Sequence, residues 1–169
     1  MACQLIKGNE ILCRDSVGGV KTIYLANFEN VQSTTISSGI CTDITMAGTT
    51  KFYTFQLSKE DAQFDSNVVA SLENSTVYFE ETLTFSMNKM SASLMNQIKN
   101  LAQARLMAIV LDNNGTYWVA GVTLGVDLTE GTASTGKAFG DGNKAILTFV
   151  GKEPSNTPTF TGTLATITD

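Results

Sequence analysis

The segment from Thr76 to Met90 alternates between apolar and polar side chains along most of its length. A strand places successive side chains on opposite faces of a sheet, so this period of two predicts a strand with one buried and one polar face. Only Glu81 interrupts the apolar face, and we expect it to lie near the edge of the sheet or to face another subunit. A strand of this length needs partner strands, which makes the fold mainly β.

Shorter segments of similar character recur along the chain. Asn113-Asn114-Gly115 separates two of them, and Asn-Gly between apolar runs is typical of the tight turn that joins antiparallel strands. Residues Ala62 to Ser71 fit either a loop or a short strand. The other strands that we expect are Val20 to Phe28 (covered on both faces), Lys51 to Leu57, Leu106 to Asp112, Thr116 to Leu124, Lys144 to Gly151 and Thr159 to Thr168.

One segment has the period of a helix instead. Ser91 or Ser93 can cap its N-terminus, and the pattern continues to about Arg105. Its apolar stripe, which we expect to pack across the sheet, consists of Leu94, Ile98 and Leu101. The sequence therefore predicts an antiparallel β-sandwich or small barrel with one flanking α-helix at about 91–105.

Two segments rich in Ser, Thr and Gly break the strand pattern, at about 30–50 and 125–143. The first fits a hairpin with arms at Thr34 to Ser37 and Ile40 to Met46, whereas the second reads as irregular. Loops this long in a compact domain usually bind something or are disordered. We expect both to extend from one domain of residues 1–169, so that deleting Thr34 to Thr49 preserves folding.

The composition supports one strand-rich domain. A length of 169 residues suits a single core. Only 16% of the residues are charged, against about 25% in an average protein, while 23 are Thr. Branched side chains such as Thr fit a pleated, half-buried surface and favour strands. No apolar run approaches the ~20 residues that cross a bilayer, so no membrane anchor is expected.

The same composition excludes several classes of function. Histidine is absent, which removes Ser-His-Asp and Cys-His catalysis and zinc sites that use histidine. A net charge of −5 and the lack of any basic cluster disfavour tight binding to nucleic acid. The cysteines are Cys3, Cys13 and Cys41, without a C-x-x-C pair, and the first residues lack the apolar core of a secretory signal. These features favour reduced thiols in a cytosolic protein.

Candidate chemical motifs fail on spacing or context. Gly131 to Ala138 follows the spacing of a phosphate loop, but it ends in Ala and lies before a strand rather than a helix. Glu80 and Glu81 point to opposite faces of a strand and cannot share acid–base chemistry. The carboxylates of the two long segments lack calcium-loop spacing. Eight aromatic residues of the strand-like segments have no basic surround and are expected in the core, and they are Phe28, Phe52, Tyr53, Phe55, Phe79, Phe85, Trp118 and Phe149. We therefore expect no enzyme activity and no catalytic, cofactor-binding or metal-binding residues.

The second half of the chain carries a recognisable order of features. An aromatic strand enters Gly121, the run TGKAFGD spans Thr135 to Asp141, and a strand from Ala145 to Gly151 precedes a Glu-Pro turn. With the helix and the Asn-Gly hairpin before them, these residues at about 87–160 resemble the C-terminal half of the tail tube proteins of tailed bacteriophages. Ring and collar proteins of short-tailed phages use the same fold.

This resemblance implies a structural protein of the virion, made in the cytoplasm of the host bacterium. Subunits would form homo-oligomeric rings, usually of six, that stack into a tail tube or collar and contact other tail or portal-proximal proteins. DNA would pass through the lumen without specific binding, which suits an acidic chain. Charged residues are depleted at interface cores, so the low charge fits close contact between copies. The candidate contact residues are Thr34, Thr35, Ile36, Ile40, Asp43, Thr45, Asp127, Thr129, Glu130 and Phe139.

Two other functions remain open at this point. A capsid-decorating or head-completion protein would assemble on an existing lattice and stay monomeric or trimeric alone. A soluble ligand-binding β-sandwich would be monomeric, with aromatic side chains exposed in a groove. The state of association of the purified protein separates these alternatives from a ring-forming subunit.

Overall fold

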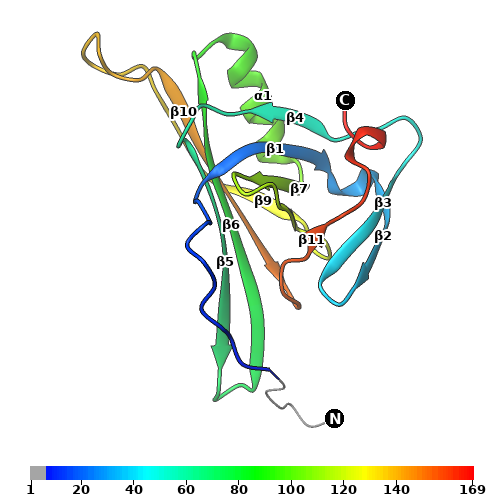
Figure 1. The fold of residues 1–169 in the computed structure, drawn as a ribbon. Helices are drawn as coiled ribbons and strands as arrows, with labels where there is room; N and C mark the ends of the chain where they lie inside the picture. The colour runs from blue at the N-terminus through cyan, green and yellow to red at the C-terminus, as the bar shows by residue number, and fades with distance from the viewer. Residues whose placement is uncertain (1–6) are drawn as a thin grey trace.

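Eleven strands and one α-helix make up most of the chain in the computed structural model, which describes residues 7–169 (Figure 1). Cys3 lies outside the described residues. The elements are β1 (Val20–Asn27), η1 (Phe28–Asn30), β2 (Val31–Ser37), β3 (Ile40–Met46), β4 (Tyr53–Gln56), β5 (Ala62–Ser71), β6 (Thr76–Asn88), α1 (Ala92–Gln103), β7 (Leu106–Asp112), β8 (Tyr117–Ala120), β9 (Val126–Ser134), β10 (Lys144–Glu153), β11 (Thr159–Phe160) and η2 (Leu164–Thr166).

The strands form one mixed sheet with two parts. The seven-stranded layer has the order β4-β1-β7-β8-β11-β3-β2, and the four-stranded layer has the order β5-β6-β10-β9. Pairing of Leu106 in β7 with Val126 in β9 joins the two layers along one side. The sheet does not close into a barrel, so the mainly β, sandwich-like fold class expected from the sequence is confirmed.

The main hydrophobic core lies between the two layers. It brings Ile23 and Val110 of the seven-stranded layer together with Leu83 and Phe149 of the four-stranded layer. The rings of Phe85 and Phe149 stack with their centroids 5.7 Å apart and an interplanar angle of 3°. Both rings belong to the four-stranded layer and are fully buried. Phe55 of β4 meets Phe85 edge-on with ring centroids 5.9 Å apart, and this contact joins the two layers.

A second core covers the opposite face of the seven-stranded layer. Met107 and Ile109 of β7 point into it, whereas Ala108 and Val110 point into the main core. β1 alternates in the same way, which confirms the expectation that the segment from Val20 is covered on both faces. The remaining buried members of the second core come largely from β3 and the C-terminal segment, and they are Ala26, Cys41, Ile44, Phe52, Val119, Phe160 and Ile167.

The β2–β3 hairpin therefore belongs to the folded domain. The predicted arms are confirmed, and the chain turns between them at Ser38-Gly39. However, Cys41 is fully buried and Ile44 is 2% exposed, so β3 supplies part of the second core. The expectation that this segment can be deleted without loss of folding therefore does not fit the structure, because deletion would expose the apolar residues beneath β3.

The predicted helix is confirmed as α1. The hydroxyl of Ser91 caps its N-terminus by accepting a hydrogen bond from the backbone N–H of Leu94 at 3.2 Å. Leu101 is buried in the main core, with Ile98 packed beside it. The helix thus lies over one end of the sandwich, as Figure 1 shows.

Four expectations about strands need correction or refinement. The strand expected at Thr116 to Leu124 shortens to β8, which ends at Ala120 before the turn at Gly121. The ambiguous segment from Ala62 is a full strand, β5, because it pairs along its whole length with β6. Residues 126–134, read as irregular, form β9 through pairing with β10, which overrides their weak strand propensity. The last predicted strand shortens to β11, because the hydroxyls of Thr166 and Thr168 bond to nearby carbonyls and favour the tight turn of η2.

Candidate assembly surfaces

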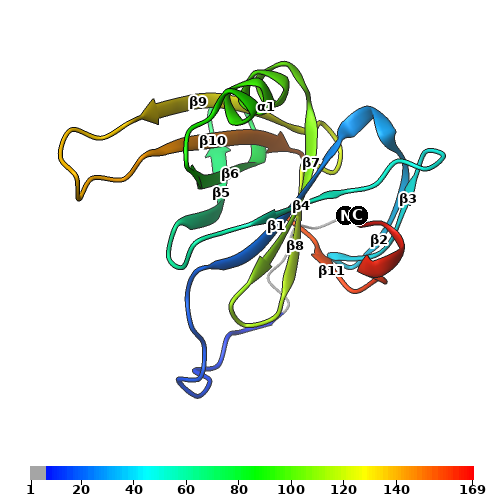
Figure 2. The ribbon, with the colours of Figure 1, turned by 90° about the horizontal axis from the view of Figure 1, so that it is seen from above.

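Two hairpins of the four-stranded layer project from opposite ends of the molecule (Figures 1 and 2). The β5–β6 hairpin turns at residues 72–75, and the β9–β10 hairpin turns at residues 135–143. Lys144 at the start of β10 pairs with Asn88 at the end of β6. The β9–β10 turn therefore lies at the end of the layer where β6 finishes, and the β5–β6 turn lies at the other end.

Both edges of the four-stranded layer carry long stretches of backbone without a partner. Within residues 7–169, β5 pairs only with β6. β9 pairs with β10 along its length, but with β7 only at Val126. Unpaired N–H and C=O groups on such edges are a template for pairing with a strand of another chain. The layer is thus open to extension on both sides.

The face of the four-stranded layer that points away from the main core is polar. Alternation and register place four carboxylates on it, from Asp65, Glu80, Asp127 and Glu130. They place two ammonium groups there, from Lys144 and Lys152. Lys152 lies 3.9 Å from the carboxylate of Glu80. This face is therefore weakly acidic and otherwise carries mainly Thr, Ser and Asn, with Val69, Tyr78, Ile146 and Val150 as its apolar or aromatic residues.

The predicted contact residues fall into two separate groups. In the β2–β3 hairpin, Thr34 is half-buried and the others are exposed, with Ile36 and Ile40 about two-fifths exposed. In the four-stranded layer, the members of the second group are exposed on β9 and its turn. The two groups lie in different layers, so the structure does not bring them together in one protomer. The exposed members of the first group are Thr35, Ile36, Ile40, Asp43 and Thr45, and those of the second are Asp127, Thr129, Glu130 and Phe139.

Asp141 orders the β9–β10 turn. Its carboxylate accepts hydrogen bonds from the backbone N–H groups of Lys137 at 2.8 Å and Ala138 at 2.7 Å. These two bonds hold the pKa of Asp141 below its ordinary value. Both N–H groups belong to the segment Gly131 to Ala138, which has the spacing of a phosphate loop, and here they donate to Asp141. The turn presents Phe139 with its whole side chain exposed.

A groove of about 650 Å³ opens between the two layers. Its apolar walls include Val20, Phe64, Val110 and Trp118, and Glu60 lies at its border. The indole N–H of Trp118 donates to the carboxylate of Asp112 at 3.1 Å, which fixes the orientation of the ring. The expectation that Trp118 packs in the core holds only in part, because this ring also lines the groove.

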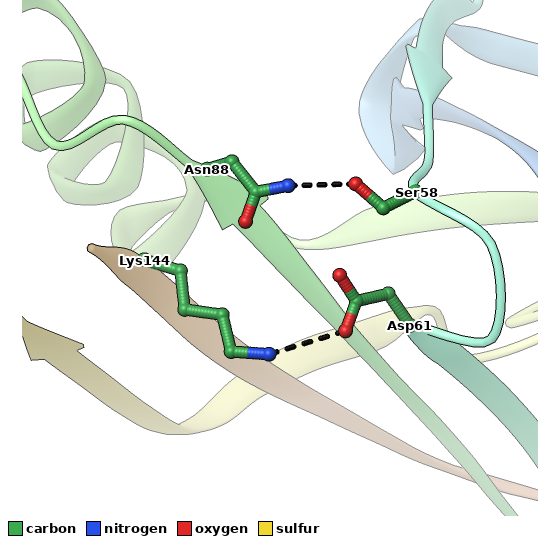
Figure 3. A network of polar contacts seen from close by, with 4 residues as sticks. All are labelled: Ser58, Asp61, Asn88 and Lys144. Atoms are coloured by element: carbon green, nitrogen blue, oxygen red, sulfur yellow. Dashed lines mark hydrogen bonds and ion pairs between the residues drawn. The ribbon is translucent and has the colours of Figure 1, made fainter. Parts of the chain in front are cut away.

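The β4–β5 loop, which carries Glu60, is tied to the four-stranded layer by two contacts (Figure 3). The amide of Asn88 donates to the hydroxyl of Ser58 at 2.7 Å, and the ammonium of Lys144 lies 3.1 Å from the carboxylate of Asp61. Glu60 lies between these two anchors and has a left-handed backbone, with φ of 60°. Its position at the border of the groove is therefore set by contacts on both sides.

A second groove, of about 750 Å³, runs beneath α1. Its walls combine apolar residues of the main core, such as Leu25 and Phe85, with the amides of Asn27, Gln97 and Asn100. Beside it, Tyr53 of β4 is 62% exposed, so the expectation that this aromatic residue packs in the core is wrong. Tyr53 lines this groove, and its strand, β4, pairs with β1 on one side.

Two buried carboxylates support the loops between the layers. Glu81 is 1% exposed and accepts hydrogen bonds from the backbone N–H of Gly121 at 2.7 Å and the hydroxyl of Thr157 at 2.6 Å. Glu153 is 4% exposed and accepts from the backbone N–H groups of Thr123 and Leu124. The expectation that Glu81 lies at a sheet edge or faces another subunit is wrong, because β6 is an inner strand and these groups enclose the side chain.

Burial raises the pKa of Glu81, and the charge of nearby Glu153 adds to that effect, although the bonds from Thr157 and Gly121 oppose it. Both side chains line a small pocket of about 170 Å³. Both carboxylates bind backbone groups of the same chain, so their arrangement stabilises the loops. Sequence patterns singled out Glu81 as unusual, but they gave no sign of its partners.

The described residues hold no group of three or more Cys, Asp or Glu side chains placed to bind a metal ion. In the same part of the chain, no helix has the length and apolar content needed to span a membrane. Comparison of the chain with protein-family models, with curated proteins and with solved structures finds no significant match.

Proposed function

We propose that the protein is a structural subunit of a tailed bacteriophage, which assembles into homo-oligomeric rings that stack into a tail tube or form a collar. The resemblance in the second half of the chain motivates this function. The single observation that supports it best is the four-stranded layer with two long unpaired edges, β5 on one side and β9 on the other.

The direction of the strands suits closure into a ring. The four strands β5, β6, β10 and β9 are antiparallel to one another in turn, so β9 runs opposite to β5. When copies are related by rotation about a ring axis, β9 of one copy meets β5 of the next in antiparallel orientation. The pairing pattern within the layer then continues across each junction, because the number of strands is even.

Closed into a ring, the four-stranded layers of all copies would form one barrel, and the size of this barrel suits a conduit. Six copies would contribute 24 strands, and strands spaced about 4.8 Å apart and tilted by about 40° would close a barrel about 45–50 Å across at the backbone. The polar face of the four-stranded layer would line the lumen, because the opposite face packs against the main core. Carboxylates and hydroxyls on that face would repel or only weakly contact DNA phosphates, which would allow DNA to slide.

The state of association of the purified protein tests this function. Native mass spectrometry and negative-stain microscopy over a range of concentrations should reveal rings, or tubes of stacked rings, with the mass of a small integral number of 18.1 kDa subunits. A chain that stays monomeric at high concentration contradicts the proposal and favours the ligand-binding alternative. Trimers that do not stack would favour a capsid-decorating role.

A further inference from the structure

Phe139 is the most exposed large apolar residue in the described part of the chain. It lies in the β9–β10 turn, which extends away from the body of the molecule in both views (Figures 1 and 2). The turn is ordered by the bonds of Asp141 to Lys137 and Ala138 rather than left free. An aromatic side chain held in a preorganised position without cover is typical of an interface anchor, since little conformational entropy remains to be lost on binding.

The groove between the layers has the character of a receptor for such an anchor. Its walls include Phe64 and Trp118, and the Asp112 contact fixes the indole. Its volume of about 650 Å³ exceeds that of one aromatic side chain, so it can also take residues next to the anchor. In Figure 2 the β9–β10 turn and the β7–β8 hairpin beside the groove lie on different sides of the protomer. Phe139 therefore lies away from this groove in its own chain.

Charge at the two sites is complementary. Lys137 lies two residues before Phe139, and its side chain is exposed. Glu60 lies at the border of the groove and is also exposed. Among the described residues, neither side chain forms an ion pair. A cation beside the anchor and an anion at the border of the groove would favour one orientation of the contact.

The register of the four-stranded layer places the two sites at the same end. The β9–β10 turn lies beyond the end of β6, where Asn88 pairs with Lys144. β5 starts at that end too, because Ala62 pairs with Phe85. If β9 of one copy pairs with β5 of the next, the turn that carries Phe139 comes next to the neighbour's Glu60 and Phe64.

From these observations we infer that Phe139 of one subunit inserts into the groove formed by Val20, Phe64, Val110 and Trp118 of the adjacent copy of this chain, with Lys137 facing the neighbour's Glu60. The inference deepens the proposed function and rests on it, since the occupant of the groove is a second copy. The contact joins two different surfaces, so it propagates around a ring instead of stopping at a dimer.

Substitution of the anchor gives the first test. Phe139→Ala should weaken self-association, measured by sedimentation velocity across a concentration series, by about tenfold or more, as expected for a central aromatic anchor. Leu72→Ala is the matched control, because Leu72 is 97% exposed in the β5–β6 turn at the other end of the layer. Circular dichroism should show the same fold and melting temperature for both variants and the wild type.

A charge exchange gives the second test, independent of the apolar contact. Lys137→Glu and Glu60→Lys should each weaken association several-fold, most strongly at low salt, and the double variant should recover most of the loss. Glu73→Lys combined with Lys137→Glu is the control that should not recover it, because Glu73 lies at the opposite end of the layer.

The outcomes separate the two levels of the argument. A wild-type chain that stays monomeric overturns the proposed function and the inference with it. A wild-type chain that forms rings while Phe139→Ala associates equally well overturns the inference and leaves the proposed function standing. Failure of the Lys137→Glu and Glu60→Lys pair to restore association also overturns it, because the two residues then do not face each other.

Discussion

The carboxylate of Glu81 in the middle of the sheet accepts a hydrogen bond of 2.7 Å from the backbone N–H of Gly121, which lies 40 residues later in the chain. Gly121 has a positive φ of 72°, and a Cβ atom there would lie 2.8 Å from the backbone of Gly125. The turn between β8 and β9 thus packs tightly on itself and needs an acceptor for its buried N–H. Glu81 supplies that acceptor and so links β6 to the junction of the two layers.

Removal of the Glu81 side chain should therefore destabilise the fold. Glu81→Ala leaves the Gly121 N–H without a partner and opens a cavity, and we expect the free energy of unfolding to fall by about 3 kcal/mol. Glu81→Gln keeps an acceptor for Gly121 and can donate to the hydroxyl of Thr157, so its loss should stay within about 1 kcal/mol. Urea denaturation measures both values. Glu73→Ala, at an exposed turn, is the control, and an equal loss in the Ala and Gln variants would contradict this role.

Stability should also depend on pH through Glu81. Its pKa is raised in the folded state by burial, so the folded protein holds this proton more tightly than the unfolded chain does. The contribution of Glu81 to stability is then fully present below the ordinary pKa of a glutamate and is lost as the pH rises through the folded value. Gln cannot titrate, so the free energy of unfolding of the wild type minus that of Glu81→Gln should decrease as the pH rises from about 4. A difference that increases over the same range would refute the assignment.

The order of the β9–β10 turn should depend on Asp141. Asp141→Ala removes the acceptor for the N–H groups of Lys137 and Ala138, so these amides should exchange with solvent faster while the exchange of β9 and β10 stays unchanged. Hydrogen exchange followed by NMR resolves the individual amides. The pKa of Asp141 in the folded protein is lower than that of an ordinary aspartate. In the wild type, both amides should therefore remain protected at the ordinary pKa of aspartate, and they should lose protection only when the pH falls through the lower, folded-state pKa. Protection that survives in Asp141→Ala would mean that other contacts order the turn.

The β2–β3 hairpin should contribute to stability through one face only. Ile44 is 2% exposed in the second core, and Ile44→Ala should cost about 2–5 kcal/mol, as for other buried aliphatic residues. Ile36 lies in the same hairpin but is 42% exposed, so Ile36→Ala should cost less than about 1 kcal/mol. Thermal and chemical denaturation of the two variants give the comparison. Similar small losses for both would show that the hairpin is separable from the domain after all.

Local sequence signals identified most elements but few of their partners. The alternation in β6, the Asn-Gly turn before β8 and the serine cap of α1 each depend on residues close together in the chain. The glycine-rich segment at about 125–143 did not indicate a strand, yet residues 126–134 form β9 because they pair with β10. The groove also escaped prediction, because Trp118 was expected in the core and the segment that holds Phe64 fitted either a loop or a strand. Only the separation of the layers leaves these side chains accessible.

The sequence by itself determined the mainly β class, the single helix and the absence of histidine chemistry, because periodicity, capping and composition act locally or on the chain as a whole. The tertiary structure alone decided that Glu81 is buried, that β5 and β9 are edges and that the side chain of Phe139 is fully exposed. These properties depend on contacts between distant residues, such as the bond between Val17 and Asn114 across 97 positions. No local pattern encodes which distant group will arrive beside a given side chain, since that depends on how the whole sheet pairs and bends.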